Sequence, residues 1–279
     1  MKKLGKILVA IVSILLCLFY LFPFYIVIVN AFKNRKELYE NMLALPQTFT
    51  PEYFLKAMDK MNFLRAFSNS FIVTVVSITI LIVLASMTAW MLVRTNDRFS
   101  KAMFMIFVAT MIIPFQTIMM PLLQVMGWVK NTTNIPMVNS LGGLIYMNVG
   151  FGASMAVFLY HGFIKTIPVS LEEAATIDGC NKFWVFWKIV FPILKPTTVT
   201  VMILDVIWIW NDYLLPLLIL SKKELRTIPL STSSFFGQFT NEWNLAMAGL
   251  LLTIVPVIIF YLAAQKYIVK GVAAGAVKM

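Results

Sequence analysis

The chain has 279 residues, of which 60% are hydrophobic and only 13% are charged, and its formal net charge is +11. The apolar content exceeds the roughly 45–50% that is usual for soluble domains, which excludes an ordinary water-soluble protein. The 23 Lys and Arg residues are scattered through the polar stretches and form no basic patch interleaved with aromatic residues, which argues against a nucleic-acid partner.

Long apolar runs separate the charged stretches. Each run has about 20 residues or more, so as a helix it can cross a hydrocarbon core about 30 Å thick. The runs are apolar on all sides, which excludes the alternating pattern of a β-barrel. The sequence therefore predicts an all-α membrane protein with six transmembrane helices, over Ile7–Val29, Asn69–Val93, Ala102–Met126, Leu141–Phe163, Thr197–Leu220 and Leu245–Gln265.

The first run has some features of a signal peptide, because Lys2, Lys3 and Lys6 precede it. It is longer than the usual apolar core of about 7–15 residues, however, and no A-x-A cleavage signal follows it. We expect this helix to remain attached.

The charges of the short loops predict the orientation in the membrane. Arg94, Arg98 and Lys101, between the second and third runs, outweigh the single Lys130 between the third and fourth. Positive loops face the cytoplasm, so the N-terminus is expected inside. With six spans, the C-terminus is expected inside as well.

The most informative segment is the loop between the fourth and fifth runs, residues 168–179. Ser170 and Glu173 have the spacing of a capping box, which predicts a helix that starts at Leu171. Gly179 can end this helix. Glu172 and Glu173 lie in the first turn, where the helix dipole favours acidic side chains. Ala174 and Ala175 have small side chains, which allow another protein to approach one surface of the helix closely. We expect a short helix that docks against another protein.

A second amphipathic piece, residues 181–191, carries Trp184 and Trp187 before Pro192 and Pro196 introduce the fifth run. Aromatic residues beside a span are typical of the membrane interface, and for this piece alone that interpretation is favoured.

Polar residues within spans are functional candidates. Asp205 and Asp212 are seven residues apart with Trp208 between them, so one helix would place all three on one face. Amides, carboxylates and aromatic faces together suit a sugar or polyol, whereas the alternative is that they link helices. The substrate candidates are Trp208, Asn211, Asp212 and Asn148; Asp205, Gln116 and Thr117 complete the polar inventory.

Catalytic and metal sites are not expected. His161 is the only histidine and cannot form a metal site alone, and Cys17 and Cys180 form no recognisable disulfide framework. An aspartyl protease would need facing carboxylates from different helices, whereas both aspartates lie in one span. No G-x-x-x-x-G-K-[ST] phosphate loop occurs, so a partner would have to hydrolyse ATP. Acidic residues within spans also serve proton relays, which makes a proton-coupled secondary sugar transporter one candidate function.

Glu173-Ala174-Ala175, Gly179, Ile189 and Pro192 fit the spacing of the EAA loop. The chain thereby resembles binding-protein-dependent ABC importer permeases, with Phe191 where Leu is usual. It is most similar to the carbohydrate branch and the smaller permeases of maltose-type transporters. Further matching segments are Asn30-Ala31-Phe32-Lys33, Asn69-Ser70, Trp210-Asn211-Asp212 and the tail from Gly271 to Lys278, although Met279 replaces the usual Gly.

The resemblance implies a type I importer fold and import of a carbohydrate by alternating access. The implied partners are a second homologous permease, two ATPase subunits that use ATP and Mg, and an extracytoplasmic solute-binding protein. The implied location is the cytoplasmic membrane of a prokaryote. Whether the cargo is a sugar, an oligosaccharide or a glycerol phosphate stays open, and this chain itself is expected to bind no cofactor.

The resemblance also assigns regions and residues. Residues 1–66 would form the first span and an extracytoplasmic loop, 67–266 the transmembrane core with the coupling loop 168–196, and 267–279 a cytoplasmic tail. The outer loop from Ser221 to Trp243, with Phe235, Phe236, Gln238 and Phe239, would meet the binding protein. Contacts with the ATPase are implied for Glu172, Glu173, Ala174, Ala175, Asp178, Gly179, Ile189 and Pro192, and for Gly271, Gly275 and Lys278 in the tail.

Overall fold

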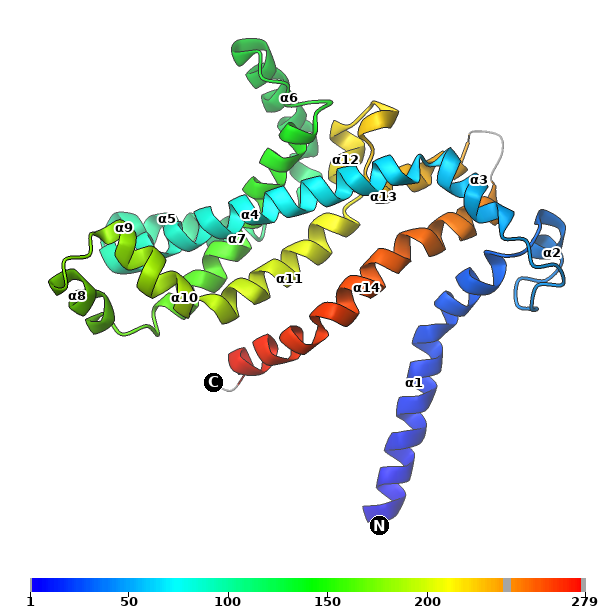
Figure 1. Cartoon of the computed structure of the whole chain (residues 1–279), viewed down its shortest axis with the longest axis horizontal. Coiled ribbons are helices and arrows are strands. Elements are labelled where there is room, and N and C mark those ends of the chain that lie inside the picture. Colours follow the sequence, from blue (N-terminus) through cyan, green and yellow to red (C-terminus); the bar gives the residue numbers. More distant parts are fainter. Residues whose placement is uncertain (1, 238–241, 277–279) are drawn as a thin grey trace. The chain divides into compact units, whose positions relative to one another are not determined.

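The computed structural model of the protein describes residues 2–237 and 242–276, and every secondary-structure element in these ranges is a helix (Figure 1). This confirms the predicted all-α class. A π-helical turn covers Phe186–Val190, and 3₁₀ turns cover Lys223–Leu225 and Thr232–Phe235. The α-helices are α1 Lys2–Asn30, α2 Arg35–Glu40, α3 Glu52–Lys60, α4 Phe63–Thr95, α5 Arg98–Thr110, α6 Phe115–Thr133, α7 Leu141–Ile164, α8 Ser170–Ile177, α9 Lys182–Val185, α10 Phe191–Ile193, α11 Lys195–Asn211, α12 Leu214–Ile219, α13 Ile228–Ser231 and α14 Trp243–Ala276.

Among the described residues, four helices are long and apolar enough to cross a membrane, namely α1, α4, α7 and the Trp243–Leu262 part of α14. The number rises to 6 if each of two bent pairs forms one span. These pairs are α5 with α6, bent by 109°, and Lys182–Ile193 with α11, bent by 74°. The chain is therefore a multi-pass membrane protein, as the apolar runs predicted.

The third apolar run is not the single helix that we expected over residues 102–126. Helix α5 ends at Thr110, and α6 begins at Phe115 after Pro114, whose ψ of 132° is extended. Proline has no backbone N–H and its ring clashes with the preceding turn, so the helix is interrupted here. Hydropathy alone did not reveal this break, because the flanking residues are apolar on both sides.

The fifth run, expected as one helix over residues 197–220, is also broken. Helix α11 ends at Asn211, and Asp212 has an extended ψ of 128°. The Asp212 carboxylate accepts hydrogen bonds from the backbone N–H groups of Leu214 at 3.1 Å and Leu215 at 3.4 Å. Asp212 thus satisfies the free N–H groups at the start of α12, and this local bond competes with continuation of α11.

The chain divides into two compact units. One combines Met1–Ala66 with Ser231–Ile259, and the other combines Phe67–Leu230 with Phe260–Met279. Helices α1 to α3 lie in the first unit, whereas α5 to α12 lie in the second.

The first unit has a small core around Phe235, which packs with residues such as Ala57, Met61 and Ala246. A Cβ atom added at Gly249 would lie 2.4 Å from the Phe235 ring, so this glycine makes room for it. Phe235 is only 1% exposed, so its side chain packs in this core and is not available for a contact with a binding protein. Phe236 is exposed, whereas Gln238 and Phe239 lie outside the described residues.

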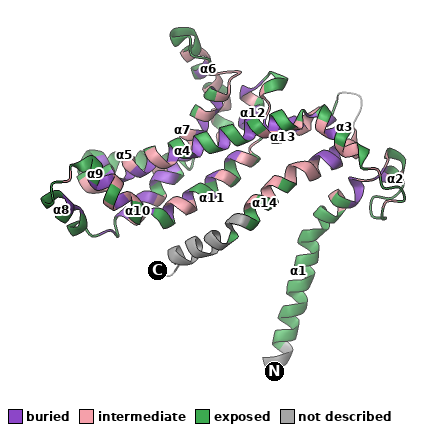
Figure 2. Ribbon diagram, in the orientation of Figure 1, coloured by how far each residue is buried: buried purple, intermediate pink, exposed green. Residues whose placement is uncertain are grey.

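Helix α1 differs from the other long helices. Every residue from Gly5 to Tyr25 is exposed within the chain, as Figure 2 shows, and the first buried residue is Val29. Its apolar side chains are therefore exposed along most of its length, within the part of the chain that the structure describes. This pattern is expected for a helix that faces lipid or another subunit.

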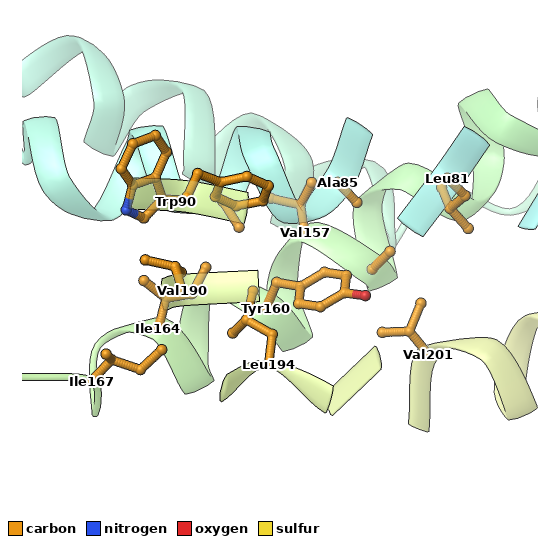
Figure 3. Packing of buried hydrophobic residues seen from close by; sticks show 13 residues of the cluster. Leu81, Ala85, Trp90, Val157, Tyr160, Ile164, Ile167, Val190, Leu194 and Val201 are labelled. Atoms are coloured by element: carbon orange, nitrogen blue, oxygen red, sulfur yellow. The ribbon is translucent and has the colours of Figure 1, made fainter. Parts of the chain in front are cut away.

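The core of the second unit forms around α7, whose apolar residues are buried on several sides. Figure 3 shows Trp90 of α4 and Tyr160 of α7 among aliphatic side chains that include Val157 and Leu194. The Tyr160 hydroxyl donates a hydrogen bond to Thr198 Oγ1 at 3.0 Å, which satisfies its polar end. This packing fixes the helices that position the candidate site.

Candidate coupling helix and transport cavity

Helix α8 begins one residue earlier than the sequence predicted, and the expected capping box between Ser170 and Glu173 is absent. Val169 already has helical φ and ψ of −64° and −29°, which places Ser170 inside the helix. The first N–H groups instead donate to the carbonyl oxygens of Pro168 and Val169, at distances from 2.9 to 3.3 Å. Backbone carbonyl groups thus accept the hydrogen bonds at the start of α8 that we had assigned to side chains.

The end of α8 agrees with the prediction. Gly179 has a φ of +87°, in the left-handed region that favours glycine. Its N–H donates to the Thr176 carbonyl, and the Cys180 N–H donates to the Ala175 carbonyl, both at 3.0 Å. These two bonds form a Schellman motif, which ends α8 at Ile177.

The two sides of α8 have different environments. Glu172 and Ala175 are buried within the chain, whereas Glu173, Ala174 and Asp178 are exposed. Ile177 is 85% exposed, which is unusual for a large apolar side chain. Ala174 and Ala175 therefore do not share one surface, since adjacent helical residues point about 100° apart. The outward surface of α8 consists of Glu173, Ala174, Ile177 and Asp178.

Glu172 links α8 to the end of α4. Arg94 Nη2 lies 2.6 Å from Glu172 Oε1, and Arg94 Nε donates to the same oxygen at 2.8 Å. The indole N–H of Trp90 donates to Oε2 at 3.0 Å. Arg94 Nη2 also donates to the carbonyl oxygen of Ile167 at 3.1 Å. Trp90 and Arg94 are four residues apart and so share a helix face, a signal that the sequence analysis missed.

The segment after α8 packs against it through α9 and the π-helical turn. Asn181 Oδ1 accepts a hydrogen bond from the Trp184 backbone N–H at 3.0 Å and so caps α9. Phe186 is buried in the core, whereas Trp184 is exposed, which confirms that the piece is amphipathic. Ile189 lies half-buried in the π-helical turn, and Pro192 is exposed in α10.

A cavity of about 1100 Å³ lies among α4, α5, α6, α7 and α11. Most of its lining is apolar, and its few polar groups include Asp205 and Trp208 on α11 and a hydroxyl pair, Thr110 and Ser154. The two hydroxyl oxygens are 2.6 Å apart. Asp205 was in our polar inventory, whereas the hydroxyl pair was not, because the two hydroxyls are far apart in the sequence.

The structure separates the predicted substrate residues. Trp208 lines the cavity, but Asn148 is buried outside its lining, and Asn211 donates to the Ile207 carbonyl of its own helix at 2.8 Å. Asp212 lies beyond the end of α11, so the expected common face with Asp205 and Trp208 does not form. Gln116 and Thr117 are exposed near the start of α6, outside the cavity lining.

The remaining candidates have simpler positions. His161 stacks on the Phe104 ring, with 3.6 Å between the ring centroids, and no group of side chains suited to a metal occurs in the described part of the chain. Helix α14 continues to Ala276, so the backbone of Gly271 and Gly275 is helical. Lys278 lies outside the described residues.

The chain is similar in sequence to known transport proteins. The model of the family described as binding-protein-dependent transport system inner membrane component matches residues 81–274. The probable starch degradation products transport system permease protein AmyC of Thermoanaerobacterium thermosulfurigenes is 46% identical, over 98% of this chain and 97% of that protein. The melibiose/raffinose/stachyose import permease protein MelC of Bacillus subtilis is 34% identical, over 99% of this chain and 98% of that protein.

The fold is also similar to a solved structure. A chain of a bacterial ABC transporter involved in the import of the acidic polysaccharide alginate superposes with a TM-score of 0.82. The match covers 95% of this chain and 97% of that chain, at 21% sequence identity. The likeness at this identity concerns the fold alone.

Proposed function

The chain belongs to the family of binding-protein-dependent transport system inner membrane components and is a permease subunit of an ABC importer, and we propose that its cargo is a carbohydrate. The names of its relatives support this cargo, since AmyC is named for starch degradation products and MelC for melibiose, raffinose and stachyose. The cargo crosses the membrane by alternating access, and a separate ATPase supplies the energy.

The observation that carries the coupling proposal is the geometry of α8. Its outward surface is exposed, its end is fixed by Gly179, and its inward surface is bonded to α4 through Glu172 and Arg94. A short helix that is rigidly attached to a span can transmit the movement of a partner, because its displacement must move the span as well. Such differential contact is what allows ATP binding to favour one state of a transporter.

We propose the following partners for this arrangement. We place α8 on the cytoplasmic side, with both termini inside, against one of two ATPase subunits that bind ATP and Mg. A second permease completes the pathway, and a solute-binding protein delivers the sugar from outside. The membrane is the cytoplasmic membrane of a prokaryote.

We assign residues to these roles as follows. The outward surface of α8 contacts the ATPase, while Gly179, Ile189 and Pro192 keep the loop in shape and Glu172 and Ala175 hold it to the core. Trp208 lies on the pathway. The tail, with Gly271, Gly275 and Lys278, forms a second contact with the ATPase.

The test is uptake by the whole importer reconstituted in vesicles with its partner subunits. A panel of radiolabelled sugars should enter only with ATP on the cytoplasmic side and with the binding protein outside. Uptake that needs neither ATP nor the binding protein but follows an imposed proton gradient would instead support the secondary transporter. The absence of ATP-driven uptake for every sugar would contradict the carbohydrate proposal.

A further inference from the structure

Asp205 has no partner although it is buried. Its exposed fraction is only 6%, and no hydrogen bond or ion pair to it occurs in the described part of the chain. Buried carboxylates within membrane spans are costly and are almost always bonded or paired. Asp205 lines the 1100 Å³ cavity, so a hydrogen-bond donor that enters this cavity can reach its carboxylate.

Gly152 on α7 leaves space at this carboxylate. A Cβ atom added there would lie 3.4 Å from Asp205 Oδ1 and 2.9 Å from Leu81 Cδ2. The second distance is shorter than real Cβ contacts, so the end of the Leu81 side chain on α4 would have to move. The absence of a side chain at position 152 thus leaves room for Leu81 and for Asp205 Oδ1.

The hydroxyl pair in the lining presents an acceptor. Thr110 Oγ1 donates to the carbonyl oxygen of Phe107 at 2.7 Å, so its hydrogen is not available to Ser154. Ser154 must therefore be the donor in the 2.6 Å bond between the two hydroxyls. The lone pairs of Ser154 Oγ remain free to accept a hydrogen bond.

Trp208 lies three residues after Asp205 and also lines the cavity. Its indole ring offers an aromatic surface, on which the apolar C–H face of a sugar ring can pack. The cavity volume of about 1100 Å³ is slightly above the range of about 300–1,000 Å³ that is typical of small-molecule sites. A disaccharide or a longer segment therefore has enough room.

We propose that this cavity is a sugar-binding subsite for neutral, hydroxyl-rich units, with Asp205 and Ser154 as hydrogen-bond acceptors and Trp208 as the stacking surface. The proposal rests on the proposed carbohydrate function and narrows it. The hydroxyl groups of a sugar can donate hydrogen bonds to Asp205 and Ser154. A phosphate or a uronic acid would instead bring a second negative charge toward the Asp205 carboxylate. Of the possibilities that the sequence left open, neutral sugars fit and a glycerol phosphate does not.

The experiment uses the complete permease–ATPase complex in detergent without the binding protein. Any preference for one sugar over another then arises in the transmembrane pathway. Equilibrium binding is measured for radiolabelled maltotriose, as the neutral probe, and for trigalacturonic acid, as the acidic probe of the same length. Wild type should bind maltotriose and not the acid. Asp205→Asn should weaken maltotriose binding about tenfold, in line with a hydrogen bond to a charged group. Trp208→Leu should also weaken it.

Thr200→Val is the matched control. Thr200 lies on the same helix, donates to the Pro196 carbonyl of that helix and does not line the cavity. It should bind maltotriose as wild type does, and all variants should assemble with their partners, as measured by size-exclusion chromatography.

Three results would overturn the subsite. The first is equal binding of the two probes by wild type, and the second is unchanged maltotriose binding by Asp205→Asn and Trp208→Leu. The third is loss of assembly in Asp205→Asn, which would show that the carboxylate pairs with a cation of the second permease. The proposed function fails separately, if the wild-type importer takes up no sugar with ATP.

Discussion

At the level of single residues, the position of α8 depends on the donors that surround Glu172. The carboxylate receives hydrogen bonds from Arg94 and Trp90, and the Glu172 and Arg94 side chains are only 10% and 18% exposed. An ion pair with so little solvent contributes mainly through the penalty for breaking it, since a single remaining charge would be buried without compensation. This pair therefore fixes one geometry of the loop relative to α4.

We expect Arg94→Ala to lower the free energy of unfolding by about 3 kcal/mol, because it leaves Glu172 buried and unpaired. Thermal unfolding of the purified protein in detergent measures the change. Arg98→Ala is the control, since Arg98 is exposed and begins α5. Adding Glu172→Leu to an Arg94→Leu variant should recover part of the loss. Equal unfolding temperatures for Arg94→Ala and wild type would contradict the role of this pair.

Gly179 gives a second residue-scale prediction. Gly179→Ala should cost about 1–2 kcal/mol, because a residue with a Cβ is strained at its positive φ. No atom lies within 4 Å of the added Cβ, so the cost comes from the backbone and not from a clash. Gly162→Ala is matched, since Gly162 also has free space but is helical, and it should be neutral or stabilising. Chemical denaturation compares the two, and equal effects would refute the backbone explanation.

At the level of elements, α8 is a helix whose two surfaces have different tasks. The inward surface holds it to the core, and the outward surface is free in this chain. A substitution on one surface should therefore affect a different property from a substitution on the other. This separation follows from the burial of Ala175 and the exposure of Ile177, which the spacing of the EAA loop did not reveal.

Ile177→Glu should reduce assembly with the ATPase, since it places a charge on the exposed apolar surface, while the unfolding temperature of the isolated permease stays unchanged. Ala175→Glu should instead lower that temperature, because its charge would be buried. Co-purification with the ATPase and thermal unfolding give the two readouts. Normal assembly of Ile177→Glu would show that the ATPase docks elsewhere.

The segment after α2 gives a pH-dependent prediction. The Glu37 carboxylate accepts hydrogen bonds from the Thr48 hydroxyl at 2.6 Å and from the Gln47 backbone N–H at 3.1 Å. The bond from Thr48 is the main cause that lowers the pKa of Glu37 below its ordinary value of 4.5. Its stabilising effect is therefore complete above pH 4.5 and disappears as the pH falls through the lowered pKa.

We expect hydrogen exchange of residues 41–48 to become faster as the pH falls through this window, after correction for intrinsic exchange. Glu37→Gln cannot titrate and should remove the pH dependence. If hydrogen exchange in Glu37→Gln depends on pH as it does in wild type, another titrating group causes the effect.

At the level of the whole molecule, the sequence predicted the helical class and the approximate positions of the four long apolar helices α1, α4, α7 and α14. Long apolar runs are sufficient for that, because only helices satisfy their own backbone groups in lipid. The breaks were not predictable from hydropathy, since the bond from Asp212 to the start of α12 replaces helical bonds within an apolar stretch. The cavity was not predictable either, because it requires Gly152, Asp205 and Ser154, which lie on two helices, to meet.

The tail tests the connection between this chain and the complete importer. Deletion from Gly271 onward should reduce the amount of sugar imported per ATP hydrolysed, if the tail contacts the ATPase as we propose. ATP hydrolysis and sugar uptake are measured together in the reconstituted importer. A deletion variant with unchanged values for both would show that the tail is dispensable.

Helix α1 contains in its own sequence what membrane insertion requires. The mean hydropathy of its most apolar 18-residue stretch is 2.8, and no residue of that stretch is buried within the chain. A nascent chain can therefore partition this helix into the bilayer as soon as it leaves the ribosome, since insertion depends on hydrophobicity and needs no later span. Synthesis of α7, in contrast, yields a helix whose neighbours on α11 are not yet made. Insertion of α1 is thus independent of the core, whereas the core can assemble only after α11 has been made.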